Sequence, residues 1–202
     1  MNFLAHIYLS GDNELIRIGN FMADGIKGSQ YKSYPTDIQI GILLHREIDT
    51  FTDSHPIVRQ STKRLHPNYS HYSSVIVDIL YDHFLAKNWT QYSDTPLSVY
   101  VENFYDSLSN YGELLTSRIK HLTPYMIADN WLLSYAEIEG IQRVLNGMNR
   151  RTNHKSGMHT ATYELKLYYT EFETEFTEFF EELRAFSIDK LLQLQHQYYP
   201  SS

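Results

Sequence analysis

Apolar residues recur three or four positions apart along most of this chain, which is the spacing of one face of an α-helix. The clearest stripe runs from Leu165 to Leu183, with aromatic residues on one side and glutamates on the other. Strict alternation of apolar and polar residues, which is typical of a half-buried strand, is nearly absent. The pattern predicts helices near 12–25, 36–52, 56–65, 72–89, 96–110, 135–147, 160–183 and 185–197, with a short helix over Phe3–Leu9.

Polar residues beside the prolines mark the expected helix ends. The six prolines each fall next to residues that favour helix termini, and Thr36, Ser54 and Thr123 are expected helix starts. No internal repeat, low-complexity tract or Gly/Ser linker marks a second domain. The expected fold class is therefore all-α, a single-domain helical bundle over residues 1–202.

The composition is that of a globular protein, and it limits the available chemistry. Hydrophobic residues make up 42% of the 202 residues, with 17 Tyr and 10 Phe, whereas a disordered chain would be poorer in both. There is no cysteine, which excludes disulfides, zinc–thiolate sites and cysteine nucleophiles. A metal would be held by His, Asp, Glu or Asn, a ligand set that suits Mn²⁺, Mg²⁺, Fe²⁺ or a catalytic zinc.

Charge and hydropathy exclude several classes of partner. The N-terminal stretch has no basic leader, and its short apolar run includes His6, so it does not resemble a signal peptide. No stretch approaches the roughly 20 apolar residues that span a membrane. The net charge of −7 argues against nucleic acid as a partner. We expect a soluble, cytoplasmic protein with no membrane and no nucleic-acid partner.

Charge is nevertheless distributed unevenly towards the C-terminus. Between Ile141 and Lys155 there is no acid, and the basic residues are Arg143, Arg150, Arg151 and Lys155. The segment from Glu164 to Glu182 is rich in glutamate. One interpretation is a solvated acidic helix that follows a basic loop. The alternative is that the basic stretch meets an acidic partner or a phosphate, because complementary charge speeds encounter.

Polar groups that suit catalysis interrupt two otherwise apolar segments. His45 and Asp49 continue an apolar stripe at a spacing of four, so they share one helix face. Asp78 and Asp82 lie four apart in SVIVDILYDHFLAKNW, which is apolar on nearly every side and indicates a buried helix. Buried carboxylates are costly unless a cation or hydrogen bonds compensate them. A metal ion between two helices would satisfy several of them together.

Other polar residues are candidates for the same cavity. Asp24 lies in NFMADGIKG, and His6 and Asn20 precede it closely in the sequence. At Asp53, helix capping is favoured slightly over catalysis. Arg46 suits either a phosphate oxygen or a carboxylate, because its planar guanidinium matches both. Each residue alone is better explained as a structural His or a helix cap, whereas the whole set favours a metal site.

Five stretches of the chain resemble one known family. In order, MNFLAHIYLS, GNFMADGIKG, GILLHREIDTFTDSHP, VDILYDHFLAKNW and IQRVLNGMNRR are similar to the acyl carrier protein phosphodiesterase family, and the resemblance covers essentially the entire chain. It implies an HD-phosphohydrolase-like helical fold. It also implies hydrolysis of the phosphodiester between 4′-phosphopantetheine and a serine of holo-acyl carrier protein. The implied cofactor is a divalent metal, typically Mn²⁺, with Mg²⁺ or Fe²⁺ as alternatives.

The resemblance also implies particular residue roles. It places metal ligands at Asp24, His45, Asp49 and Asp82. His83 is expected to orient water or to protonate the leaving serine oxygen, and Arg46 to stabilise charge on the phosphoryl oxygens. The chain reads Asp82-His83 where the wider HD superfamily has His-Asp, so which of the two binds metal stays open. On charge alone, and not from the resemblance, the basic run from Arg143 to Lys155 is expected to dock the acidic carrier.

Two other functions remain as alternatives. One is a metal-dependent phosphohydrolase that acts on a nucleotide or another small phosphodiester. The other is a non-catalytic helical binding protein whose polar core only fixes packing. The sequence contains no Gly-rich phosphate loop and no G-x-S-x-G elbow, which disfavours the corresponding nucleotide-binding and serine-hydrolase mechanisms.

Overall fold

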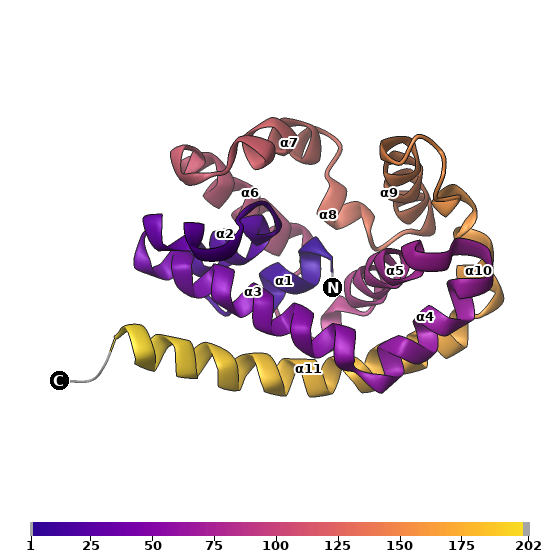
Figure 1. Ribbon diagram of the computed structural model, residues 1–202. Coiled ribbons are helices and arrows are strands. Elements are labelled where there is room, and N and C mark those ends of the chain that lie inside the picture. Colours follow the sequence, from indigo (N-terminus) through magenta and orange to yellow (C-terminus); the bar gives the residue numbers. More distant parts are fainter. Residues whose placement is uncertain (1, 200–202) are drawn as a thin grey trace.

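The computed structural model describes residues 2–199, and within this range it contains helices and no β-strand (Figure 1). The all-α prediction is confirmed. Short 3₁₀ turns join some of the helices, among them η1 (Ala23–Gly25) and η2 (Gly28–Ser33). The helices are α1 (Phe3–Tyr8), α2 (Glu14–Met22), α3 (Thr36–Ser54), α4 (Pro56–Tyr69), α5 (Ser73–Lys87), α6 (Leu97–Asn110), α7 (Ser117–Ala128), α8 (Trp131–Ser134), α9 (Ile138–Arg151), α10 (Thr162–Leu167) and α11 (Tyr169–Tyr198).

The helices differ from the predicted ones at several places, and α7 and α8 lie between residues 110 and 135, where the sequence predicts no helix. The sequence predicts a helix start at Thr123, but Thr123 and Pro124 lie inside α7. A proline removes one backbone donor from a helix, and here the helix continues through it. The sequence also predicts a boundary near residue 184, whereas α11 runs through that position without a break. Neither Gly nor Pro stands there to interrupt it.

Helix α11 packs along α3, α4 and α5 and lies at the lower edge of Figure 1. Its aromatic stripe is the core of this contact, since Phe172, Phe176, Phe179, Phe180 and Leu183 are fully buried. Burying one such side chain stabilises the fold by roughly 1.5–3 kcal/mol. The stripe therefore fixes the outer side of α3, and the opposite side of α3 carries the candidate site.

A buried ion pair also fastens α11 to α4. Both nitrogens of the Arg64 guanidinium lie 2.6 Å from the carboxylate oxygens of Glu175. Ser61 and Gln60 donate further hydrogen bonds to the same carboxylate. These bonds lower the pKa of Glu175, although burial alone would raise it. Glu175 is thus a buried acid with a structural role.

Two glycines let α2 and α3 approach each other closely. A Cβ atom at Gly41 would lie 2.7 Å from the backbone nitrogen of Asn20, and one at Gly19 would lie 2.9 Å from the Cα atom of Ile38. Real Cβ atoms do not come so near to backbone. Asn20 follows Gly19 directly, and His45 lies one turn beyond Gly41. The close contact therefore places the side chains of Asn20 and His45 together.

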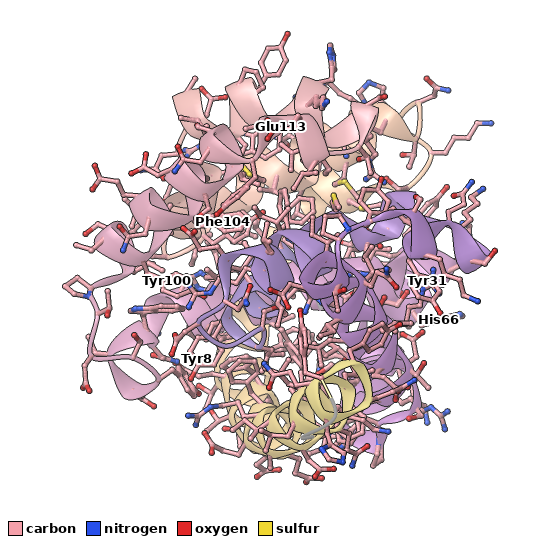
Figure 2. The ribbon with its side chains drawn as sticks, turned by 90° about the vertical axis from the view of Figure 1, so that its left-hand side faces the viewer. Tyr8, Tyr31, His66, Tyr100, Phe104 and Glu113 are labelled. Carbon is pink, nitrogen blue, oxygen red and sulfur yellow. The ribbon has the colours of Figure 1, made fainter. Side chains whose placement is uncertain are left out.

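The buried hydrophobic side chains of residues 2–199 form one continuous cluster. Phe104 of α6, labelled in Figure 2, packs on Phe21 of α2 with ring centroids 5.2 Å apart. Phe3 of α1 packs on the same ring at 5.0 Å. The N-terminal helix is thereby anchored beside α2. Within the described part of the chain, no helix is both long and apolar enough to cross a membrane.

Candidate metal site

Three side chains from α1 and α3 converge beside the α2–α3 contact. Each of His6, His45 and Asp49 offers a ligand atom, and these atoms all lie within 4.8 Å of one another. The two imidazole rings are stacked, with centroids 4.0 Å apart. The Nε2 atoms of His6 and His45 lie 3.3 Å and 3.1 Å from the two carboxylate oxygens of Asp49. Both histidines are buried.

Asn20 fixes the orientation of both imidazoles. Its side-chain oxygen lies 2.8 Å from Nδ1 of His6 and 3.1 Å from Nδ1 of His45, and its amide nitrogen donates to Ser10. Because the Asn20 oxygen can only accept, both Nδ1 atoms carry a proton. The Nε2 atoms therefore face Asp49. Histidines that bind metals characteristically donate their other ring N–H to an oxygen in this way.

Asp24 adds a second carboxylate from η1, and its Oδ1 lies 3.2 Å from Nε2 of His45. The turn that carries it is held by Arg46, whose guanidinium donates to the carbonyl oxygens of Ile26 and Gly28. Arg46 also stacks over Tyr31 of η2, which Figure 2 labels. The structure gives Arg46 a structural role in place of the expected contact with phosphoryl oxygens, because its Nη2 atom is bound to the loop behind Asp24 and its side chain does not line the cavity described below.

The cluster pushes the pKa values of its two histidines apart. Burial and the charge of His45 lower the pKa of His6 to about 4. Burial also opposes charge on His45, but hydrogen bonds to Asp24 and Asp49 outweigh it and raise its pKa to about 9. The hydrogen bond from His45 lowers the pKa of Asp24. Burial opposes the charge of Asp49, but its interactions with His45 and His6 outweigh burial and hold its pKa well below the usual value.

The donor set fits a divalent cation. Neutral His6 carries its proton on Nδ1, so Nε2 presents a lone pair towards the carboxylate of Asp49. That Nε2 atom is buried and makes no hydrogen bond within residues 2–199. The lone pair of His6 Nε2 and the Asp49 oxygen are 3.3 Å apart, and they repel each other unless a positive charge lies between them. Imidazole nitrogens with carboxylate oxygens could hold Mn²⁺, Fe²⁺ or Zn²⁺.

The cluster lies at one end of an open cavity of about 970 Å³. Its wall is shared by α1, α3, α5, α8 and α9, with one residue each from α2, η1 and α7 (Phe21, Asp24 and Arg118). Asp53 and Asp78, two of the candidates from the sequence, also line it, and burial raises the pKa of Asp78. His55 lies outside the cavity wall, with Nε2 3.2 Å from Glu182 of α11.

Asp82 has a structural role that the sequence does not reveal. It is fully buried, and its two oxygens accept hydrogen bonds from the backbone N–H groups of Leu4 and Ala5, at 2.7 Å and 3.1 Å. These are free donors at the start of α1. Burial raises the pKa of Asp82 to about 7. The prediction of Asp82 as a metal ligand is thus corrected to a structural role, because N–H groups at the start of α1 compensate its carboxylate.

His83 is also directed elsewhere. Its Nδ1 bonds to the carbonyl oxygen of Tyr135 at 2.8 Å, and its Nε2 bonds to the hydroxyl of Tyr169 at 2.9 Å. Both ring nitrogens are used, and the side chain does not line the cavity. His83 is therefore not placed to move a proton at this site. It joins α5 to the α8–α9 region and to α11.

Sequence reasoning missed two features of the cavity. Arg118 of α7 lines it together with Arg143, Arg150 and Arg151 of α9, whereas Lys155 from the same basic run does not. No local signal in the sequence connects Arg118 to the site. The sequence places Asn20 among the candidates for the cavity, but it does not predict that its oxygen accepts from both His6 and His45. That arrangement depends on the contact between α2 and α3.

Fold and site together define an all-α protein whose cavity gathers imidazole and carboxylate groups suited to a divalent cation. The family model described as acyl carrier protein phosphodiesterase matches residues 1–183. This chain therefore belongs to the acyl carrier protein phosphodiesterase family, and the resemblance found from the sequence motifs is confirmed.

Relatives of known name agree with this assignment. The chain is 33% identical over 193 residues to the acyl carrier protein phosphodiesterase of Shigella boydii and 32% identical over 193 residues to that of an Enterobacter species. Each alignment covers 95% of this chain and 100% of the relative. No solved structure matches the chain.

Proposed function

We propose that this protein is a divalent-metal-dependent phosphodiesterase that removes 4′-phosphopantetheine from holo-acyl carrier protein. The family and the names of its relatives support the reaction. The lone pair of His6 Nε2 opposite the Asp49 carboxylate supports the metal, because this arrangement is unfavourable without a cation. Mn²⁺ is the ion we propose to test first.

In this proposal the described residues gather and orient the reacting groups. His6, His45 and Asp49 would hold the metal, with Asp24 able to add a carboxylate oxygen. Asn20 keeps both Nε2 lone pairs directed at the site. A bound divalent cation supplies positive charge to the phosphoryl oxygens and acidifies the attacking water. In the reaction, a bond forms from phosphorus to the water oxygen, the bond to the serine oxygen breaks, and that oxygen takes up a proton.

Mass spectrometry of the carrier tests the reaction directly. Holo-acyl carrier protein incubated with the enzyme and Mn²⁺ is expected to lose the mass of phosphopantetheine and gain that of water. Treatment with a chelator should stop the reaction, and added Mn²⁺ should restore it. A carrier whose mass stays unchanged, while a small phosphodiester is hydrolysed, would contradict the proposed substrate and favour a small-molecule phosphodiesterase.

Metal affinity should depend on pH through His45. A ligand nitrogen must be deprotonated to bind a metal, and the pKa of His45 is raised to about 9. Below that pH one proton must leave as the metal binds, so Mn²⁺ affinity should rise roughly tenfold per pH unit up to about pH 9 and then level off. His6, with a pKa of about 4, is already neutral and adds no such dependence above pH 6.

Calorimetric titration with Mn²⁺ measures this proton directly. At pH 7.5, titrations in two buffers of different ionisation enthalpy should report the release of about one proton. An affinity that stays constant between pH 6.5 and 8.5 would contradict a role for His45 as ligand.

A further inference from the structure

Four arginines from two helices lie on the cavity that contains the candidate metal site. We call them the arginine rim, and its members are Arg118, Arg143, Arg150 and Arg151. All four side chains are exposed, whereas His6 and His45 are only 3% and 6% exposed. The arginines therefore lie towards the mouth of the cavity and the histidines at its floor.

No ion pair within residues 2–199 involves the arginine rim. The arginine–carboxylate pairs found within residues 2–199 involve other arginines, on α2, α4 and α11. On α9, Arg143 and Arg150 alternate with Gly140 and Gly147 at steps of three or four residues, so they share one face of the helix. On this face Gly147 lies between the two arginines.

Helix stability does not explain the whole rim. Arg150 and Arg151 lie in the last turn of α9, where a cation is favoured by the helix dipole. Arg118 lies in the first turn of α7, where a cation is disfavoured for the same reason. Its position opposite α9 on one cavity is thus better explained by a ligand that both helices contact.

The number and place of these charges identify the kind of ligand. A phosphodiester carries one negative charge, which is fewer than the four positive charges of the arginine rim. Four further guanidinium groups at the mouth match a partner that carries several carboxylates and extends beyond the cavity. The rest of the molecule would direct such a partner there, because the net charge is −7 and the glutamate-rich α11 lies at the opposite edge of Figure 1 from α7 and α9.

We propose that the arginine rim is the docking surface for the acidic face of the carrier protein around its phosphorylated serine. This inference rests on the proposed function, since it assumes that the substrate is a carrier protein. Docking at the rim would leave the serine-linked phosphodiester free to reach the floor of the cavity. Specificity for a protein substrate would then come from α7 and α9, separately from the residues that hold the metal.

Charge reversal tests the rim. Arg150→Glu and Arg118→Glu should each raise KM for holo-acyl carrier protein roughly tenfold or more and leave kcat near the wild-type value. The rise of KM with salt should become shallower, because fewer opposite charges are screened. Hydrolysis of bis(p-nitrophenyl) phosphate, a small diester with no protein surface, should not change. Lys120→Glu is the matched control, since Lys120 is exposed on α7 but does not line the cavity.

A binding measurement separates this inference from the proposed function. Apo-acyl carrier protein has no bond to cleave, so its binding to the Mn²⁺-loaded enzyme can be followed by fluorescence anisotropy. Binding that weakens in Arg150→Glu and Arg118→Glu but not in Lys120→Glu supports the rim, even if cleavage fails. Unchanged KM, salt response and apo-carrier binding would overturn it. Equal loss of small-diester hydrolysis would also overturn it, because the arginines would then act on the phosphate.

Discussion

The Asp49→Asn variant is expected to lose Mn²⁺ binding and phosphodiesterase activity together, each by more than about 100-fold. Asp49 is the only residue of the cluster whose two oxygens lie near both Nε2 atoms, at 3.3 Å and 3.1 Å. An amide keeps the shape but removes the negative charge, and it turns one acceptor into a donor. The substitution therefore weakens metal binding at the residue that lies next to both histidines. Calorimetric Mn²⁺ titration and the carrier assay measure the two losses.

Glu47→Gln is the matched control for this variant. Glu47 stands on α3 two residues before Asp49, but it pairs with Lys190 of α11 at 3.3 Å, on the other side of the helix. An exposed pair of this kind contributes about 0–1 kcal/mol, so both metal binding and activity should persist. Circular dichroism should show both variants folded. Wild-type Mn²⁺ affinity in Asp49→Asn would remove this residue from the site.

Gly41→Ala should destabilise the protein by about 3 kcal/mol or more, at the upper end of what overpacking usually costs. The added methyl group would lie far inside van der Waals contact of the Ile16 carbonyl oxygen and 2.7 Å from the Asn20 backbone nitrogen. These are backbone atoms, so no side-chain rotation relieves the overlap and α2 and α3 must separate. The better helix propensity of alanine offsets only about 1 kcal/mol of this cost.

The movement of α2 away from α3 should also disturb the metal site. Asn20 on α2 would move away from Nδ1 of His45, which it now contacts at 3.1 Å. We therefore expect weaker Mn²⁺ binding in any Gly41→Ala protein that still folds. Loss of such an orienting partner typically costs about 10–100-fold in affinity. Urea unfolding and Mn²⁺ titration give the two readouts.

Gly147→Ala provides the comparison for the change in stability. A Cβ atom at Gly147 would lie 3.8 Å from Nη2 of Arg150, which is an ordinary van der Waals contact. This variant should be as stable as the wild type or more stable by up to about 1 kcal/mol, because alanine favours helices. If Gly41→Ala were equally stable, the close approach of α2 and α3 would not depend on glycine.

The local pattern of the sequence determined the helices and part of the site. Apolar spacing requires only that each residue be judged against neighbours three and four positions away, so α3, α5 and the α11 stripe could be predicted. The same spacing put His45 and Asp49 on one face of α3. Asp24 is a candidate from its place in NFMADGIKG and also by the family resemblance, and the structure places its carboxylate 3.2 Å from His45.

The partners of buried polar groups could not be determined in that way. Asp82 and His83 have the composition of a metal site, since both are polar residues in an apolar helix. A buried carboxylate can be compensated by a cation or by free N–H groups at a helix start, and these alternatives look the same in sequence. The folded chain brings the start of α1 to Asp82, and Tyr135 and Tyr169 to His83.

The chain by itself thus specified most of the helices, although not α7 or α8, and which acids and imidazoles are held among apolar neighbours, because both follow from short-range periodicity. Only the tertiary structure decided that His6 and Asn20 complete the cluster and that Arg118 lies across the cavity from α9. These contacts join segments far apart in the sequence. They depend on how closely helices pack, which at α2 and α3 is set by Gly19 and Gly41.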